Sequence, residues 1–308
     1  MLRNRALALA AVASTALALT ACGSDSLSTG SSSTAGGGSS SATSGSSGGA
    51  DPALAAKLPA KVKSAGVIKV GVDATYAPNE FLDKDGKTVI GMDVDIFNLV
   101  AAKFGVKAEY VPAGFGTIIL GVNSGKFDVG VSSFTINPER EKQATMVSYL
   151  NVGTQWVVAK GNPKKVDPAN ACGMTIGAQK DTVQVDDLNA RSKKCTDAGK
   201  PAINIIVDAD QGKVTSNLVS GKTAAMLADS PIGLYAVQQT SGQLEALGDI
   251  YDSAPYGFVL PKDQTDFGQA MVDALKSLST SGEYQKAVTK WMGKDTGTIT
   301  DFAVNPVK

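Results

Sequence analysis

VNSGKFDVGVSSFTINPER (residues 122–140) and LVSGKTAAMLADSP (residues 218–231) share one pattern, and this pattern decides the fold. Each stretch predicts the end of a helix, a Ser-Gly-Lys turn, an apolar strand with a polar end, and a helix that starts at a proline. Coincidence is the alternative to a repeat, because the identical part is short. A repeat predicts two similar α/β lobes. Open α/β sheets bind ligands at the carboxyl ends of their strands, so we expect the two polar strand ends to face each other across a cleft.

The rest of the chain supports the α/β fold class, because strand and helix signals alternate from Val67 onward. Residues 67–72 predict a strand, and Asp93 is predicted to cap a helix that ends at Gly105. Each lobe should contain a mixed sheet flanked by helices, with a hinge between the lobes. The expected bounds are 60–157 and 256–308 for the first lobe and 158–255 for the second.

The N-terminus predicts export. Residues 1–21 have the charged start of a signal peptide and an apolar core too short for a membrane span, which needs about 20 apolar residues. The segment ends Leu19-Thr20-Ala21-Cys22, which resembles the bacterial lipobox with its lipidated cysteine; an ordinary signal peptide with a chance cysteine is the alternative. Residues 22–52 are rich in Gly and Ser and predict a flexible tether. We therefore expect a lipid-anchored protein on the extracytoplasmic face of the cell membrane.

Composition limits the chemistry that the chain can perform. The 308 residues include 29 basic and 29 acidic side chains and no histidine. The charge balance gives no basic patch for nucleic acid, and without histidine the commonest general base and transition-metal ligand are missing. We expect no catalytic residue, no metal and no cofactor. Cys172 and Cys195 form an even pair in an exported chain, which favours one disulfide over two free buried thiols.

The end of the first repeat carries candidate ligand groups. Asn137 can cap a helix and Pro138 suits its first position, which places Arg140 in the first turn. Backbone amides at a helix start favour an anion, and a guanidinium there can hold a carboxylate by two parallel hydrogen bonds. Ser133 and Thr135 add hydroxyl donors. The alternative is a surface arginine that pairs with a neighbouring glutamate.

Further candidates stand at other strand ends and helix starts. Asp229 follows the strand of the second repeat, where its carboxylate can pair with an ammonium or cap the next helix. Thr182 is either a helix cap or a ligand donor. Asp73, Tyr76 and Phe115 occupy similar places in the first lobe, although aromatic residues there are more often part of a core.

From about Val67 to Gly293 the chain resembles the bacterial extracellular solute-binding proteins of family 3, the polar amino-acid receptors of ABC importers. The matching stretches are, in order, GVDATYAP (71–78), GMDVD (91–95), SGKFD (124–128), TINPER (135–140), ADS (228–230), YG (256–257) and residues 282–291. The resemblance implies a two-lobed, periplasmic-binding-protein-like fold of type II that closes on an amino acid. It also implies a monomer that delivers its ligand to the permease of an ABC importer.

The resemblance also implies roles at the amino-acid backbone. Arg140 would hold the α-carboxylate, assisted by Ser133 and Thr135 from its own lobe. Thr182 would reach the same carboxylate from the second lobe. Asp229 would hold the α-ammonium.

For the ligand's side chain, the resemblance implies a place between Tyr76 and Phe115, with the polar end at Asp73. The chain departs from the family pattern at Asn79, where an aromatic residue is usual, and this makes the pocket larger or more polar. It departs again at Asp181, where a glycine is usual. Asp181 adds a carboxylate near the site, which makes the carboxylate-binding role of Thr182 less secure. We expect arginine, lysine, ornithine or glutamine to bind better than leucine or phenylalanine, with glutamate as an alternative if Asp73 points away.

Two other functions fit the same resemblance. The first is a dehydratase-like enzyme on this fold, for which Glu80 is the only nearby glutamate that could serve as an acid or base. The second is an amino-acid receptor that presents its ligand to a membrane sensor rather than to an importer.

Overall fold

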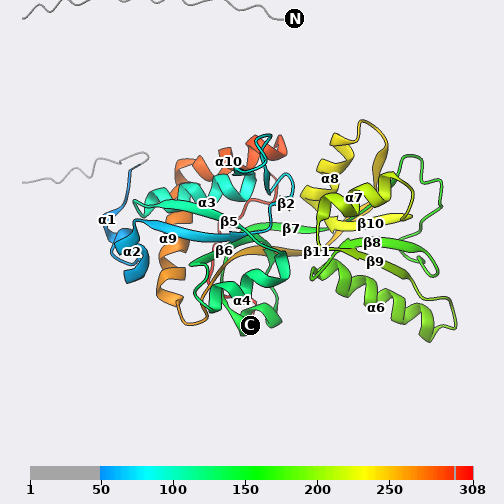
Figure 1. The fold of residues 1–308 in the computed structure, drawn as a ribbon, viewed down its shortest axis with the longest axis horizontal. Helices are drawn as coiled ribbons and strands as arrows, with labels where there is room; N and C mark the ends of the chain where they lie inside the picture. The colour runs from blue at the N-terminus through cyan, green and yellow to red at the C-terminus, as the bar shows by residue number, and fades with distance from the viewer. Residues whose placement is uncertain (1–48, 295, 308) are drawn as a thin grey trace, which may run out of the picture. The chain divides into compact units, whose positions relative to one another are not determined.

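The computed structural model describes residues 49–294 and 296–307. The signal peptide, Cys22 and most of the tether that the sequence predicts lie outside the described residues. Helix α1 (Pro52–Ala55) starts the fold (Figure 1); Asp51 caps it, and Leu54 is buried in the core. Asp51 and Pro52, the last two residues of the range 22–52 that we expected for the tether, thus belong to the first helix of the folded part.

Eight strands form one continuous sheet in the order β5-β1-β6-β11-β7-β10-β8-β9 (Figure 1). We expected one sheet per lobe, but the long strands β7 and β11 pair with each other through both halves and join them. The bounds are β1 (Val67–Val72), β5 (Lys107–Pro112), β6 (Val129–Thr135), β7 (Thr145–Ala159), β8 (Thr175–Gln179), β9 (Asn204–Asp208), β10 (Ala225–Asp229) and β11 (Leu244–Leu260). A second, three-stranded sheet contains β2 (Thr75–Tyr76), β3 (Glu80–Leu82) and β4 (Val89–Ile90).

The two halves of the large sheet have the same internal order, as the repeat predicts. β1 runs parallel to β5 and β6, and β6 is antiparallel to β11. In the other half β8 runs parallel to β9 and β10, and β10 is antiparallel to β7. The repeated units are α4 (Ile118–Asn123), β6 and α5 (Pro138–Gln143) in one half, and α7 (Gln211–Val219), β10 and α8 (Ser230–Gln239) in the other. Gly125 and Gly221 stand in the two turns with φ +76°, a left-handed conformation that glycine adopts without strain.

Helices lie on both faces of the sheet in each half (Figure 1). The first half carries α2 (Ala60–Ala65), α3 (Met92–Lys103), the short η1 (Phe115–Thr117), α9 (Thr265–Ser281) and α10 (Glu283–Met292), and the second also carries α6 (Val183–Asp197). Each half has its own apolar core, with Phe97 and Phe258 in the first and Trp156 in the second. Helix α3 corrects one prediction: Gly91 occupies its cap position, and Asp93 lies fully buried in its first turn.

The two lobes are connected by β7 and β11. Along β7, Val152 still packs in the first core, whereas Trp156 packs in the second. The pairing of β11 with β7 shifts register on both sides of Tyr251, and a Cβ atom on Gly153 would lie 2.5 Å from the Tyr251 carbonyl oxygen. This irregular segment lies between the residues that pack in the two cores, and the expected lobe bounds stay a prediction.

The second lobe contains the predicted disulfide. Cys172 and Cys195 are bonded, with their Cα atoms 5.6 Å apart, so the alternative of two free thiols is wrong. The bond ties the loop before β8 to α6.

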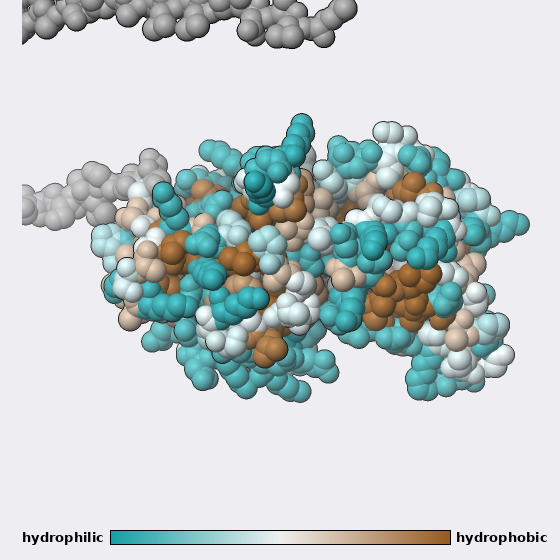
Figure 2. All heavy atoms as spheres, in the orientation of Figure 1, coloured by the Kyte–Doolittle hydropathy of each residue, from teal (hydrophilic) through white to brown (hydrophobic). Residues whose placement is uncertain are grey.

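The visible surface of the folded part is mainly polar. Figure 2 shows apolar patches that lie between polar residues. Among the helices that the structure describes, none combines the length and the apolar character that a membrane crossing requires.

Candidate functional site

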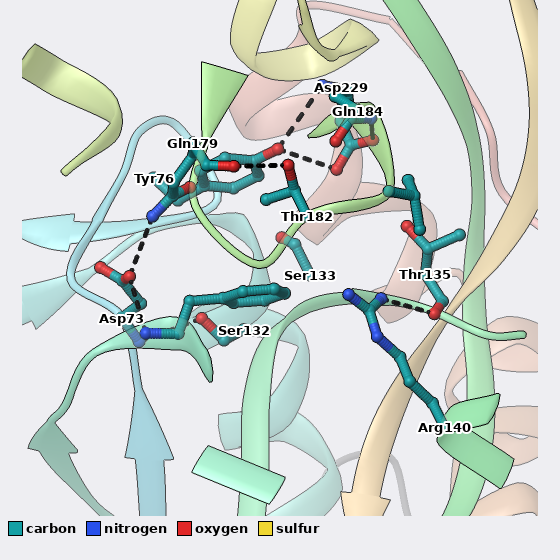
Figure 3. Close-up of a pocket in the computed structure, with 12 residues that line it drawn as sticks. Asp73, Tyr76, Ser132, Ser133, Thr135, Arg140, Gln179, Thr182, Gln184 and Asp229 are labelled. Atoms are coloured by element: carbon teal, nitrogen blue, oxygen red, sulfur yellow. Dashed lines mark hydrogen bonds between the residues drawn. The ribbon is translucent and has the colours of Figure 1, made fainter. Parts of the chain in front are cut away.

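A cavity of about 270 Å³, including the part open to solvent, lies where the polar strand ends of the two lobes meet. Its lining residues come from both lobes: Asp73, Tyr76, Phe115, Ser132, Ser133, Thr135 and Arg140 from the first, and Gln179, Thr182, Val183, Gln184 and Asp229 from the second (Figure 3). All the residues that we predicted to bind the ligand line this cavity except Asn79. The sequence argument missed Ser132, Gln179, Val183 and Gln184.

Arg140 is held in a fixed orientation on the first lobe. Its backbone N–H donates to Asn137 Oδ1 over 2.9 Å, which confirms the predicted cap of α5. Its guanidinium donates from Nη1 to the Thr135 carbonyl oxygen (2.7 Å) and lies 5.3 Å from the centre of the Phe115 ring. No glutamate forms an ion pair with it among the described residues, which removes the alternative of an ordinary surface pair. Because α5 is only one and a half turns long, the guanidinium itself must supply most of the attraction for an anion.

Asp229 presents a buried carboxylate from the second lobe. Oδ2 accepts from the hydroxyls of Tyr76 (2.9 Å) and Tyr256 (2.7 Å), and Oδ1 accepts from Gln184 Nε2 (2.8 Å). Asp229 occupies the N-cap position of α8, as the capping alternative has it, but its side chain makes no capping hydrogen bond and is directed to these donors instead. Burial raises the pKa of Asp229, while these hydrogen bonds and the charge of Arg140 oppose that rise. The carboxylate thus faces the cavity with donors on one side and a cation across from it.

Asp73 is a second anion, at the other end of the cavity from Arg140 (Figure 3). Its Oδ1 accepts from the Thr75 hydroxyl (2.8 Å), and its Oδ2 accepts from the Phe115 N–H (3.1 Å) and from Gln179 Nε2 (3.0 Å). Burial raises the pKa of Asp73, although hydrogen bonds from Thr75 and Phe115 act in the opposite direction. Since Gln179 belongs to the second lobe, this contact joins the two lobes.

The aromatic residues of the lining have separate environments. Phe115 stacks on Phe134 with 4.6 Å between the ring centres, while Tyr76 directs its hydroxyl to Asp229. Both face the cavity, and their place on either side of a ligand side chain stays a prediction.

Ser133 lines the cavity but directs its polar atoms behind the wall. Its N–H and its hydroxyl lie 3.0 Å from Asp93 Oδ2, and its Oγ accepts from Asn79 Nδ2 over 2.9 Å. Asn79 is fully buried and supports Ser133 from behind, which corrects its expected place in the ligand pocket. Thr182 donates its hydroxyl to the Gln179 carbonyl oxygen (2.7 Å), so it orders its own turn as well as lining the cavity. The roles of both residues toward a ligand carboxylate stay predictions.

Glu80 does not line the cavity. It is fully buried, and its carboxyl accepts from the hydroxyls of Ser132 (3.1 Å) and Ser133 (3.2 Å) behind the wall. The enzyme alternative therefore loses its candidate acid or base. In the described part of the chain, no group of three or more His, Cys, Asp or Glu side chains is placed to hold a metal ion.

The arrangement suits a small zwitterion. One cation and one anion approach from opposite lobes, and a second anion lies further along the same cavity. Each charge of a buried ligand needs a partner of opposite sign. A buried charge without one costs several kcal/mol, which is about the penalty for desolvating one ion.

Comparisons with known proteins agree with this geometry. The model of the bacterial extracellular solute-binding proteins, family 3, matches residues 68–294. The arginine-binding protein ArgT of Corynebacterium glutamicum is 32% identical over 255 residues, which cover 82% of this chain and 83% of the relative. A solved structure of an ancestral arginine-binding protein bound to arginine matches with a TM-score of 0.68 at 30% identity, over 74% of this chain and 99% of that one. The ancestral amino acid-binding protein AncCDT-1, a precursor of cyclohexadienyl dehydratase, matches with a TM-score of 0.67 at 28% identity, over 75% and 98%.

Proposed function

The chain belongs to family 3 of the bacterial extracellular solute-binding proteins, and from this membership we infer that it is an amino-acid-binding protein of an ABC import system. The observation that carries the inference is the placement of Arg140 and Asp229 on opposite walls of one cavity, each on a different lobe. An amino acid between them has its α-carboxylate at the guanidinium and its α-ammonium at the carboxylate. The ligand then bridges the lobes, so binding favours the closed arrangement.

The charges of the lining favour a ligand with a cationic side chain. The charged lining residues are Arg140, Asp73 and Asp229, so negative groups outnumber positive ones by one. Arginine or lysine brings two positive charges and one negative charge and balances that excess. Burial penalises the ionised form of Asp73. A ligand guanidinium beside Asp73 offsets this penalty better than the neutral hydrogen-bond donors around Asp73 do. We propose arginine as the first candidate, which agrees with the name of the Corynebacterium glutamicum relative.

The proposal places the protein on the extracytoplasmic side of the membrane with a lipid on Cys22. The support is the sequence Leu19–Cys22, together with the Gly- and Ser-rich segment that follows it. The folded part would then reach the permease of the importer from a flexible tether.

Calorimetric titration with a matched ligand pair tests the proposal. Citrulline has nearly the shape of arginine but no side-chain charge. Because a hydrogen bond to a charged group contributes about 1.5–3 kcal/mol, arginine should bind at least about tenfold more tightly than citrulline. Asp73→Asn should reduce this preference while both ligands still bind.

The outcomes separate the parts of the proposal. Equal affinity for arginine and citrulline would refute the role of Asp73. A branched apolar amino acid as the tightest ligand would refute the cationic preference. If none of the twenty amino acids, ornithine, citrulline or cystine binds, the ligand class itself is wrong.

A further inference from the structure

Two carboxyl groups meet directly behind the serine wall of the cavity. Glu80 on β3 and Asp93 on α3 are both fully buried. The hydroxyl oxygen of Ser133 lies 3.2 Å from Glu80 Oε2 and 3.0 Å from Asp93 Oδ2, so both carboxyls converge on one group. Glu80 also accepts from the hydroxyl of Ser132, the other serine of the wall.

The surroundings of this pair contain no compensating cation. Within residues 49–294 and 296–307, no lysine or arginine is hydrogen-bonded or ion-paired to either carboxyl. The neighbouring titratable groups are Tyr149 from β7, which donates its hydroxyl to Asp93, Tyr110 from β5, Tyr76 from β2, and Asp73 after β1. Each of these is neutral or negative, so none supplies a positive charge that would compensate a second negative charge on the pair.

Two ionised carboxylates in contact, buried and without a cation, repel each other strongly, and one retained proton relieves the repulsion. The electrostatic environment of the two carboxyls agrees with this reasoning. Burial, followed by the charge of Asp93, holds the pKa of Glu80 well above its usual range. Burial also raises the pKa of Asp93 to about 6, against hydrogen bonds from Tyr149 and Glu80.

The backbone at Ser133 shows what the pair supports. Ser133 has φ +50°, a left-handed conformation that is strained for a residue with a side chain. Such strain persists only where the surrounding structure holds it. Here Asp93 accepts from the Ser133 N–H and lies beside its hydroxyl, and Glu80 lies beside the hydroxyls of both serines.

We propose that Glu80 and Asp93 form a positioning pair that shares one proton and holds Ser132 and Ser133 in place on the cavity wall, so that ligand affinity depends on the pair keeping this proton. A group whose folded-state pKa is raised contributes stability that is fully present at low pH and is lost as pH rises through the folded-state pKa. Affinity and thermal stability therefore both fall as the last proton leaves. The expected pH dependence of ligand affinity rests on the proposed function. The shared proton and the expected pH dependence of thermal stability do not.

Glu80→Gln is the decisive variant, because its amide can donate to Asp93 as the protonated acid does but cannot ionise. At neutral pH it should bind arginine within about threefold of wild type, and its affinity should stay level as the pH is raised, whereas that of wild type weakens. Glu80→Ala removes the donor and should weaken binding by about tenfold or more. Glu109→Gln, an exposed glutamate on β5, is the matched control and should follow wild type at every pH.

Infrared spectroscopy of the ligand-free protein tests the shared proton independently of binding and of how well Glu80→Ala folds. The difference spectrum of wild type against Glu80→Gln should show the carbonyl band of a protonated carboxylic acid at neutral pH, and the band should disappear on alkalinisation. The same pH dependence of affinity and melting temperature in wild type and Glu80→Gln would overturn the proposal, as would the absence of that band. If arginine and every other amino acid fail to bind, the proposed function fails, while the infrared and melting results still decide on the pair.

Discussion

Arg140→Ala is the most informative perturbation of the site. The side chain is the one cation in the cavity lining, and contacts within the protein set its orientation. Nη1 donates to the Thr135 carbonyl oxygen over 2.7 Å, Nη2 donates to the Asp181 carbonyl oxygen over 3.3 Å, and the guanidinium lies against the Phe115 ring. Truncation leaves a ligand carboxylate in the closed cavity without a cationic partner.

The expected loss follows from the burial of the partners. Removing one member of a buried, hydrogen-bonded charge pair typically costs about 2–5 kcal/mol, much of it because the other charge stays buried and unpaired. This range corresponds to a loss of affinity of roughly thirtyfold to several thousandfold. Arg140→Lys keeps the charge but loses the planar fork, so its affinity should lie between those of wild type and the alanine variant.

Calorimetric titration with arginine, alongside thermal unfolding, measures the effect. Lys142→Ala on the same helix is the matched control, because this side chain is exposed and outside the cavity lining. It should bind within about twofold of wild type, since an isolated exposed charge contributes only about 0–1 kcal/mol. An Arg140→Ala protein that melts like wild type and binds arginine within about threefold of it would refute the assignment of the anchor.

Three further outcomes are expected. Because burial raises the pKa of Asp229, arginine affinity should fall on acidification at a higher pH than for an ordinary aspartate, and titration of Asp229→Asn should show a weakened affinity with a smaller acidic loss, since only Asp73 still titrates in the cavity lining. Replacing Cys172 and Cys195 by serine should lower the free energy of unfolding by about 3 kcal/mol in urea titrations, with arginine affinity little changed while the protein is folded, because neither cysteine lines the cavity. Cys22→Ala should move the protein out of the membrane fraction or stall its processing, and normal processing with continued membrane attachment would contradict the lipid anchor.

Local patterns predicted the fold well, because the repeat is encoded in consecutive residues. The Ser-Gly-Lys turns and proline-started helices identify β6 and β10 as equivalent strands. The merging of the two sheets had no such signal. It depends on β7 and β11 pairing across more than eighty residues of sequence, between Leu244 and Ala159 at one end and between Leu260 and Thr145 at the other. Register over such separations is set by packing and not by local propensity.

The site was predictable where a residue's charge limits its role. Arg140 and Asp229 could be placed because the repeat puts each of them at the polar end of one of two equivalent strands or in the helix turn that follows it. Gln179 and Gln184 carry no such signal, since glutamine is common on any surface, and only the fold shows that they bind Asp73 and Asp229. The contacts of Ser133 behind the wall had no sequence signal for a related reason: its partners lie 40 and more positions away in the sequence.

Asp181 extends the charge argument beyond the cavity lining. It stands where the family resemblance implies a glycine, and it adopts φ +64°, which aspartate tolerates better than most residues with a side chain. Room for it exists on the opposite lobe: a Cβ atom on Gly116 would lie 2.1 Å from Asp181 Oδ2, so glycine there permits the approach. The exposed carboxylate of Asp181 adds to the negative field of Asp73 and Asp229 at the site. A glutamate side chain would meet repulsion both on entry and in place, whereas a guanidinium is attracted at both stages, and this leaves a cationic amino acid as the ligand that the whole path favours.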